Sequence, residues 1–187
     1  DAPYTFAYIR TYYLFFMCLA GTVFVAASKV IILFLAGYNY IEGYKFLPFF
    51  IVGYILYGVF SFAQLGMIHS RKSYLGICVL ICGIIATVVL DIILIPCIKG
   101  YGTAIGFALG NLTMVAMAYL LSHKFFKVNY NNLKDAFLII TFMIFSLFSS
   151  FLFKTGNIYM ECLIKTFIGI FIFVLISFSP MFKSERS

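Results

Sequence analysis

The sequence predicts an all-α, polytopic membrane protein with six transmembrane helices. Hydrophobic residues make up 64% of the 187 residues and charged residues only 10%, against about 45–50% and about 25% in an ordinary soluble domain. The apolar residues form six long runs separated by short polar segments. A carboxylate and glycines at helical spacing lie inside these runs, which is typical of membrane helices that pack around a polar interior.

Each apolar run has the length of a membrane-crossing helix, since about 20 helical residues cross a hydrocarbon core of roughly 30 Å. The bilayer core offers no water to unpaired backbone groups, so the runs are expected to be helical. Pro96 is expected to end the third span, because proline cannot continue the helical hydrogen-bond ladder. Residues 37–45 are expected to form a turn. The six predicted spans are 12–36, 46–68, 74–95, 102–122, 136–153 and 162–182.

The net charge of +7 comes from basic clusters between the apolar runs, which indicates a membrane and not nucleic acid as the partner. If successive loops lie on opposite sides, one side carries three basic residues, Lys45, Lys99 and Lys154. The other side carries eight: Arg10, Arg71, Lys72, Lys124, Lys127, Lys134, Lys183 and Arg186. The more basic side is the cytoplasm. Both termini of the segment are therefore predicted to be cytoplasmic.

Neither a metal site nor a catalytic motif is predicted. The five cysteines have no metal-ligand spacing and are expected to be free buried thiols, with a Cys97–Cys162 disulfide left open. Serine–histidine–acid sets, paired carboxylates and phosphate loops are not found at the expected membrane surfaces. The sequence therefore argues against an enzyme. Residues 1–11 show no signal-peptide pattern, and we expect further sequence before them.

Charged side chains inside the spans are the best functional candidates, because a charge near the membrane centre costs about 2.5–3.5 kcal/mol on insertion scales. Lys29 and Asp91 lie at similar depth in the outer leaflet and could face each other. Lys29 could instead extend toward the headgroups, and Asp91 could make a structural contact between helices. Glu161 and Lys165 have the four-residue spacing of an ion pair at the start of the sixth helix.

Small and polar residues form three sets on the third and fourth predicted helices. Gly83, Thr87 and Asp91 lie four residues apart on the third predicted helix, and this face is expected to contact protein or water. Asn111 lies near the middle of the fourth helix, where an interhelical hydrogen bond is one expectation. A third set, expected to allow close packing of another helix, consists of Gly102, Gly106 and Gly110.

Part of this pattern resembles a known family. The residues that carry the resemblance are Thr87, Asp91, Leu94-Ile95-Pro96 and Gly102-Thr103-Ala104-Ile105-Gly106. They look like the C-terminal part of polysaccharide flippases, the O-antigen (Wzx-type) members of the multidrug/oligosaccharidyl-lipid/polysaccharide exporter superfamily. The resemblance covers about residues 4–122 and, more loosely, the last two helices. Two departures stand out: the family usually carries asparagines where Thr87 and Asp91 stand, and a glycine near Lys99.

The resemblance implies that residues 1–187 form about one lobe of a bacterial inner-membrane transporter of about twelve to fourteen helices that works by alternating access. Its expected substrate is a polyprenyl-diphosphate-linked oligosaccharide, flipped with proton or sodium coupling and no other cofactor. Expected partners are this lipid-linked substrate, membrane lipids and an N-terminal lobe of the same protein. Lys29 and Asn111 are then candidates for substrate contact, and Asp91 with Thr87 for ion coupling or gating.

Three other functions fit the same residues. A multidrug or lipid II exporter of the same superfamily would differ only in its substrate. A membrane-embedded glycan polymerase or acyltransferase would need a large periplasmic loop or a catalytic acid–base set outside this segment. In a purely structural membrane subunit, Lys29 and Asp91 would only hold helices together.

Overall fold

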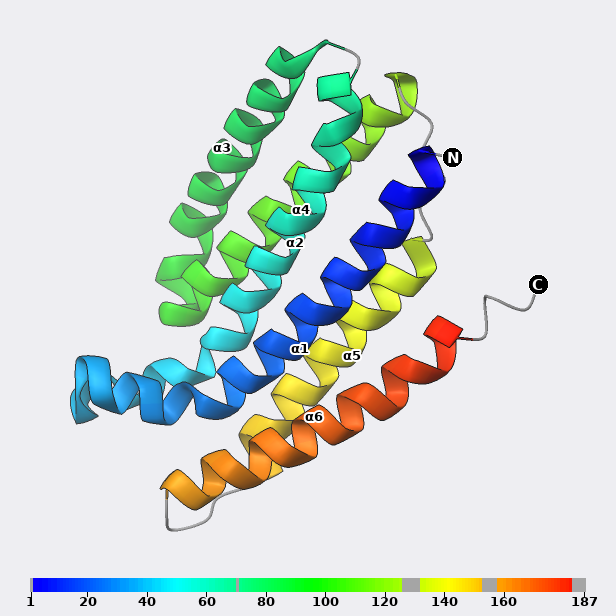
Figure 1. Ribbon diagram of the computed structural model, residues 1–187. Helices are drawn as coiled ribbons and strands as arrows, with labels where there is room; N and C mark the ends of the chain where they lie inside the picture. Colours follow the sequence, from blue (N-terminus) through cyan, green and yellow to red (C-terminus); the bar gives the residue numbers. More distant parts are fainter. Residues whose placement is uncertain (1, 70, 126–131, 153–157, 183–187) are drawn as a thin grey trace. The chain divides into compact units, whose positions relative to one another are not determined.

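The computed structural model describes residues 2–69, 71–125, 132–152 and 158–182, and the regular elements in them are all helices. The prediction of an all-α chain is confirmed for these residues. In chain order (Figure 1) the elements are α1 (Ala2–Ala36), the 3₁₀ helix η1 (Tyr38–Lys45), α2 (Leu47–His69), α3 (Ser73–Ile98), α4 (Gly100–Phe125), α5 (Asn132–Leu152) and α6 (Ile158–Phe182).

The chain forms two compact units. One consists of Asp1–Tyr12 and Phe49–Tyr130, and we call it the α2–α4 unit. The other consists of Tyr13–Pro48 and Asn131–Ser187, and we call it the α1/α5/α6 unit. Each is described by itself below.

Four of the described helices are long and apolar enough to cross a membrane: Tyr8–Ala36 in α1, Leu47–Leu65 in α2, Ser73–Ile98 in α3 and Gly100–Leu121 in α4. The described part of α5 has a shorter apolar stretch, Asp135–Ser146. On α3, large apolar side chains are exposed along most of the helix, including Ile77, Ile85 and Ile92. An exposed apolar surface of this length is expected where the surroundings are lipid.

Helices α3 and α4 form a tight antiparallel hairpin (Figure 1). The link between them is Lys99, which adopts φ 50° and ψ −127°. Its N–H donates to the carbonyl of Ile95 at 2.9 Å. The prediction that the third helix ends at Pro96 is wrong, since α3 continues to Ile98. A proline in the last turn removes a single hydrogen bond, and the bond from Lys99 closes that turn.

The N-terminal half of the chain is more helical than predicted. Helix α1 begins at Ala2 and not near Tyr12, and the predicted turn after it is the 3₁₀ helix η1. Gly37 separates the two elements with φ +82°, a conformation that glycine adopts without strain. Arg10, expected in a loop, therefore lies on α1, where it is 1% exposed and its guanidinium lies 5.6 Å from the centroid of the Tyr119 ring.

Aromatic side chains fill the α1/α5/α6 unit. Phe142 of α5 and Phe173 of α6 are fully buried. The rings of Phe15 on α1 and Phe173 have centroids 5.7 Å apart, so α1 packs on α6 at this level. Helices α5 and α6 also pack on each other, and Gly169 leaves room for the ring of Phe145. This packing fixes which residues of α1 and α6 lie side by side. The contact between the charged residues of the two helices, described next, depends on it.

Candidate functional site

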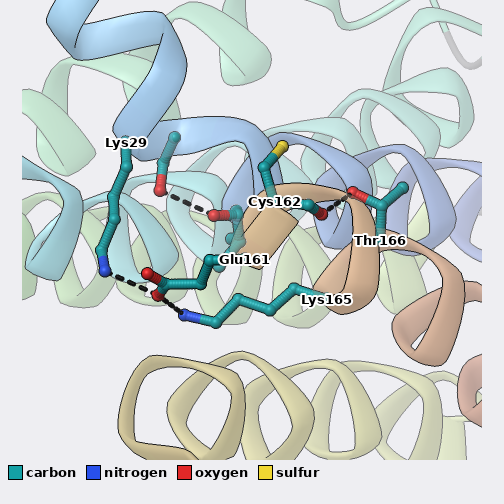
Figure 2. A network of polar contacts seen from close by, with 7 residues as sticks. Lys29, Glu161, Cys162, Lys165 and Thr166 are labelled. Atoms are coloured by element: carbon teal, nitrogen blue, oxygen red, sulfur yellow. Dashed lines mark hydrogen bonds and ion pairs between the residues drawn. The ribbon is translucent and has the colours of Figure 1, made fainter. Parts of the chain in front are cut away.

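Three charged side chains meet in the α1/α5/α6 unit (Figure 2). Lys29 comes from α1, whereas Glu161 and Lys165 lie one turn apart at the start of α6. The Nζ atom of Lys29 lies 2.6 Å from Oε1 of Glu161, and the Nζ atom of Lys165 lies 2.5 Å from the same oxygen. A single carboxylate oxygen therefore accepts hydrogen bonds from two ammonium groups that are 136 residues apart in sequence.

Burial would make this cluster costly to form if its charges were not paired. The side chains of Glu161 and Lys165 are 4% and 7% exposed, whereas that of Lys29 is 20% exposed. Taking a charge out of water costs several kcal/mol unless an opposite charge and hydrogen bonds compensate. Two lysines against one glutamate leave a formal charge of +1. The cluster therefore has an excess positive charge, and Lys29 is its most accessible member.

An aromatic ring and a small cavity complete the site. The Nζ atom of Lys29 lies 4.8 Å from the centroid of the Tyr44 ring in η1, a cation–π distance. The cavity measures about 10 Å³, and its lining includes Ser28, Tyr44 and the three charged side chains. This is about the volume that one water molecule requires. The ammonium group of Lys29 therefore has a carboxylate and a π-face as neighbours, beside room for a water.

The ion-pair partner of Lys29 differs from the predicted one. The sequence suggested that Lys29 faces Asp91, whereas its ion pair is with Glu161. The predicted pair between Glu161 and Lys165 does form, and both side chains are buried. A signal for the complete cluster was present in the sequence. Lys29, Glu161 and Lys165 are all expected near the outer membrane face, and charges in apolar surroundings are expected to pair.

Asp91 and Thr87 lie in the α2–α4 unit, where they face the glycines of α4. A methyl group added at Gly106 would collide with Oδ1 of Asp91, and one added at Gly110 would collide with Oγ1 of Thr87. One added at Gly102 would meet backbone atoms of α3 at 2.7 Å. The three glycines thus allow the backbones of α3 and α4 to approach closely.

The polar atoms on this face have different hydrogen-bond environments. The hydroxyl of Thr87 donates to the carbonyl of Gly83 one turn earlier, at 3.0 Å. Oδ1 of Asp91 is buried and has no hydrogen-bond partner among the described residues. A buried acceptor without a partner carries a desolvation cost. Among the described residues, the α3–α4 hairpin therefore provides a hydrogen-bond partner for Thr87 but none for Oδ1 of Asp91.

Asn111 makes its hydrogen bond within α4. Its Nδ2 donates to the carbonyl of Phe107 at 2.8 Å, and the residue is 7% exposed. The interhelical bond expected for Asn111 is therefore replaced by a bond one turn back along its own helix. Asn111, Thr87 and Gly110 line one cavity between α2, α3 and α4.

The described residues contain no group of three or more histidine, cysteine, aspartate and glutamate side chains placed to hold a metal ion. All five cysteines are free thiols, but the expected burial is wrong for Cys78, Cys82 and Cys97, which are exposed on the apolar surface of α3.

In the part of the chain that the structure describes, four helices are long and apolar enough to span a bilayer, which indicates a multi-pass membrane protein. Comparisons with protein-family models, curated proteins and solved structures find no match to this chain. Its function is therefore argued from its own residues.

Proposed function

We propose that this chain is about one lobe of a transporter that flips a polyprenyl-diphosphate-linked oligosaccharide across a bacterial inner membrane. All six long helices then span the bilayer, with both ends of the segment in the cytoplasm. The substrate moves from the cytoplasmic to the periplasmic leaflet by alternating access, coupled to protons or sodium. The resemblance at residues 87–106 suggests this class of protein, and the charged cluster supplies the chemistry that such a substrate needs.

The observation that carries the proposal is the surplus positive charge of the Lys29–Glu161–Lys165 cluster. A diphosphate is multiply negative and is bound by cations held where water is scarce, because Coulomb attraction strengthens as the local dielectric constant falls. Lys29 meets this requirement and is the cluster member most open to its surroundings. A neutral or cationic substrate would gain nothing from a net charge of +1.

The geometry supports an exchange mechanism. In the absence of substrate, Glu161 neutralises Lys29, which lowers the cost of holding a lysine in an apolar bundle. An arriving diphosphate offers oxygen acceptors to the same ammonium group. Lys29 then turns from Glu161 to the substrate, while Lys165 continues to neutralise Glu161 because both lie on α6 one turn apart. No buried charge is left unpaired at either stage.

The remaining candidates have roles in the α2–α4 unit. Asp91 is the proposed coupling residue, since a buried carboxylate oxygen without a partner can take a proton or contact a cation. Thr87 and Gly106 hold the helix face on which it lies. Asn111 is the proposed polar contact for the sugar, through the amide oxygen that does not face Phe107.

Flipping of a lipid-linked oligosaccharide by the full-length protein in proteoliposomes tests the proposal. We expect Lys29→Ala to slow flipping by at least about tenfold, equivalent to about 1.4 kcal/mol, and Lys29→Arg to retain most activity. Lys45→Ala is the matched control, because Lys45 pairs with the exposed Glu42 in η1. Wild-type flipping by a folded Lys29→Ala variant would reduce the cluster to a structural role, and no flipping by the wild type would reject the substrate.

A further inference from the structure

The α2–α4 unit contains a second site, which the proposed function does not use as a whole. A cavity of about 360 Å³ lies between α2, α3 and α4, within the range of about 300–1,000 Å³ that is typical of ligand pockets. Tyr54 and Tyr57 contribute from α2, and Phe107 contributes from α4. The Tyr54 and Phe107 rings have centroids 5.2 Å apart, so aromatic side chains from two helices border the space.

Small residues create this space. Gly83 on α3 faces the side chain of Met114 on α4, and Gly110 on α4 faces Thr87 on α3. Gly110 therefore lets the backbone of α4 come close to Thr87 on α3, and Gly83 makes room for the side chain of Met114. Larger residues at either glycine position would occupy the room or force the helices apart.

The wall of the cavity is mostly apolar, and no charged residue lines it. Besides the hydroxyls of Tyr54 and Tyr57, its polar side chains are those of Thr87, which donates to Gly83 O, and Asn111, whose Nδ2 donates to Phe107 O. A phosphate, a carboxylate or an ammonium group would find no opposite charge here. The cavity therefore suits a hydrocarbon ligand whose polar end lies elsewhere.

The expected depth of the cavity in the membrane indicates where the hydrocarbon ligand comes from. Ile84 and Val88 lie 11 and 15 residues after the start of the 26-residue helix α3, so they are near mid-depth at about 1.5 Å of rise per residue. They also line the cavity and are 55% and 51% exposed, so its edge is open. Around a spanning helix at this depth, the bilayer offers acyl chains.

We infer that the α2–α4 cavity binds an acyl chain of a membrane phospholipid, with the chain inserted past Ile84 toward Met114. The bound acyl chain fills the space between the three helices and lies between Ile84 and Val88 of α3 and Phe107 of α4. This site contains no residue of the charged cluster, but its lining includes Thr87 and Asn111, to which the proposed function gives other roles.

Photocrosslinking in nanodiscs tests the site. The full-length protein is reconstituted with a phospholipid that carries a diazirine near the end of one acyl chain, and labelled residues are mapped by mass spectrometry. We expect label on Met114, which is only 4% exposed yet lines the cavity. Lipid on the outer surface would instead label Ile92 on α3, which is 69% exposed and does not line the cavity.

A blocking variant provides the decisive comparison. Ile84→Trp places a large ring at the edge of the cavity, and we expect at least about fivefold less label on Met114, equivalent to about 1 kcal/mol. Ile85→Trp is the control, because Ile85 is equally exposed on α3 but does not line the cavity. If Ile84→Trp does not fold, Val88→Phe serves the same purpose.

Two results would overturn the inference. One is absence of label on Met114 in the wild type, or label that Ile84→Trp leaves unchanged. The other is label on Met114 from a diazirine polyprenyl phosphate that excess phospholipid does not reduce, because the occupant would then be an isoprenoid chain. Neither result depends on whether the protein flips a lipid-linked oligosaccharide.

Discussion

Glu161 is the residue on which the charged cluster depends, because its Oε1 is shared by Lys29 and Lys165. Removing either lysine leaves one ion pair intact. Removing the carboxylate leaves two ammonium groups facing each other in a buried site. The contributions of the three residues to stability are therefore expected to be unequal.

We expect Glu161→Gln to lower the free energy of unfolding by about 3–5 kcal/mol, the usual result of breaking a buried pair. Lys29→Met should cost less, since Lys165 still neutralises Glu161. The measurement is equilibrium unfolding of the purified protein in detergent. Glu42→Gln is the control, because Glu42 is 78% exposed and surface pairs are worth about 0–1 kcal/mol. Equal losses for Glu161→Gln and Lys29→Met would contradict the shared-oxygen arrangement.

Lys99 is the second residue whose conformation matters, since it connects α3 and α4 with φ 50°. Side chains rarely adopt this region, and glycine does so without strain. We expect Lys99→Gly to raise the melting temperature, with a gain of about 1 kcal/mol. Lys99→Ala should leave stability unchanged, because alanine keeps the strained Cβ. A stabilising effect of both variants would mean that the charge, and not the backbone, is responsible.

At the scale of elements, the α3–α4 hairpin depends on three glycines that meet different atoms. Gly102 faces the backbone near Leu94, which cannot move aside. Gly106 faces the carboxylate of Asp91, a side chain that can rotate. A larger residue is therefore expected to disturb the packing of α3 and α4 more at Gly102 than at Gly106.

We expect Gly102→Ala to destabilise the hairpin by about 1–3 kcal/mol, the range for overpacked sites. Gly106→Ala should cost less, and Asp91→Ala in the same chain should recover most of the loss. Gly43→Ala is the control, because the nearest atom to its added methyl group would lie 3.7 Å away, in ordinary contact. Melting temperatures of the single and double variants rank these losses of stability. Failure of Asp91→Ala to rescue Gly106→Ala would rule out this contact as the cause.

For the molecule as a whole, the cysteines report on how the helices lie in the membrane. Cys78, Cys82 and Cys97 are exposed on α3, a helix long and apolar enough to span the bilayer. Exposure to lipid protects a thiol from a water-soluble reagent, whereas exposure to water does not. Cys97 lies one residue before the end of α3, and Cys82 lies well inside it.

We expect a membrane-impermeant maleimide to label Cys97, and not Cys82, in spheroplasts that express single-cysteine variants of the full-length protein. Labelling of Cys97 without permeabilisation follows from the proposed orientation, which places this end of α3 in the periplasm. Both thiols should react after denaturation in detergent, which is the control for reactivity. Labelling of Cys97 only after permeabilisation would reverse the orientation.

The sequence predicted the helices well and their ends less well. Long apolar runs dictate helices because a bilayer leaves no other way to pair backbone groups. The ends depend on local conformations that composition does not encode, such as those of Gly37 and Lys99. Helix α3 therefore passes Pro96, and α1 begins ten residues earlier than expected.

Arg10 illustrates the consequence for charge counting. Because Arg10 is buried on α1, it does not contribute a loop charge to the side that the sequence predicts to be cytoplasmic. The cytoplasmic placement of both termini stays a prediction, which the maleimide experiment tests.

By itself, the sequence determined that the chain is helical and apolar enough for a membrane, and that Lys29, Asp91 and Glu161 carry its unusual charges. These conclusions need only composition and spacing, because the cost of a charge or an open backbone in lipid does not depend on the fold. The pairing of Glu161 with Lys165 follows from spacing in the same way.

Only the tertiary structure decided which distant groups meet. Lys29 joins Glu161 because α1 packs on α6 through Phe15 and Phe173, a register that no local pattern encodes. The cavity beside Thr87 and Asn111 likewise exists because α2, α3 and α4 converge there. Contacts between helices depend on how complete side-chain surfaces fit together, and that fit is a property of the folded chain.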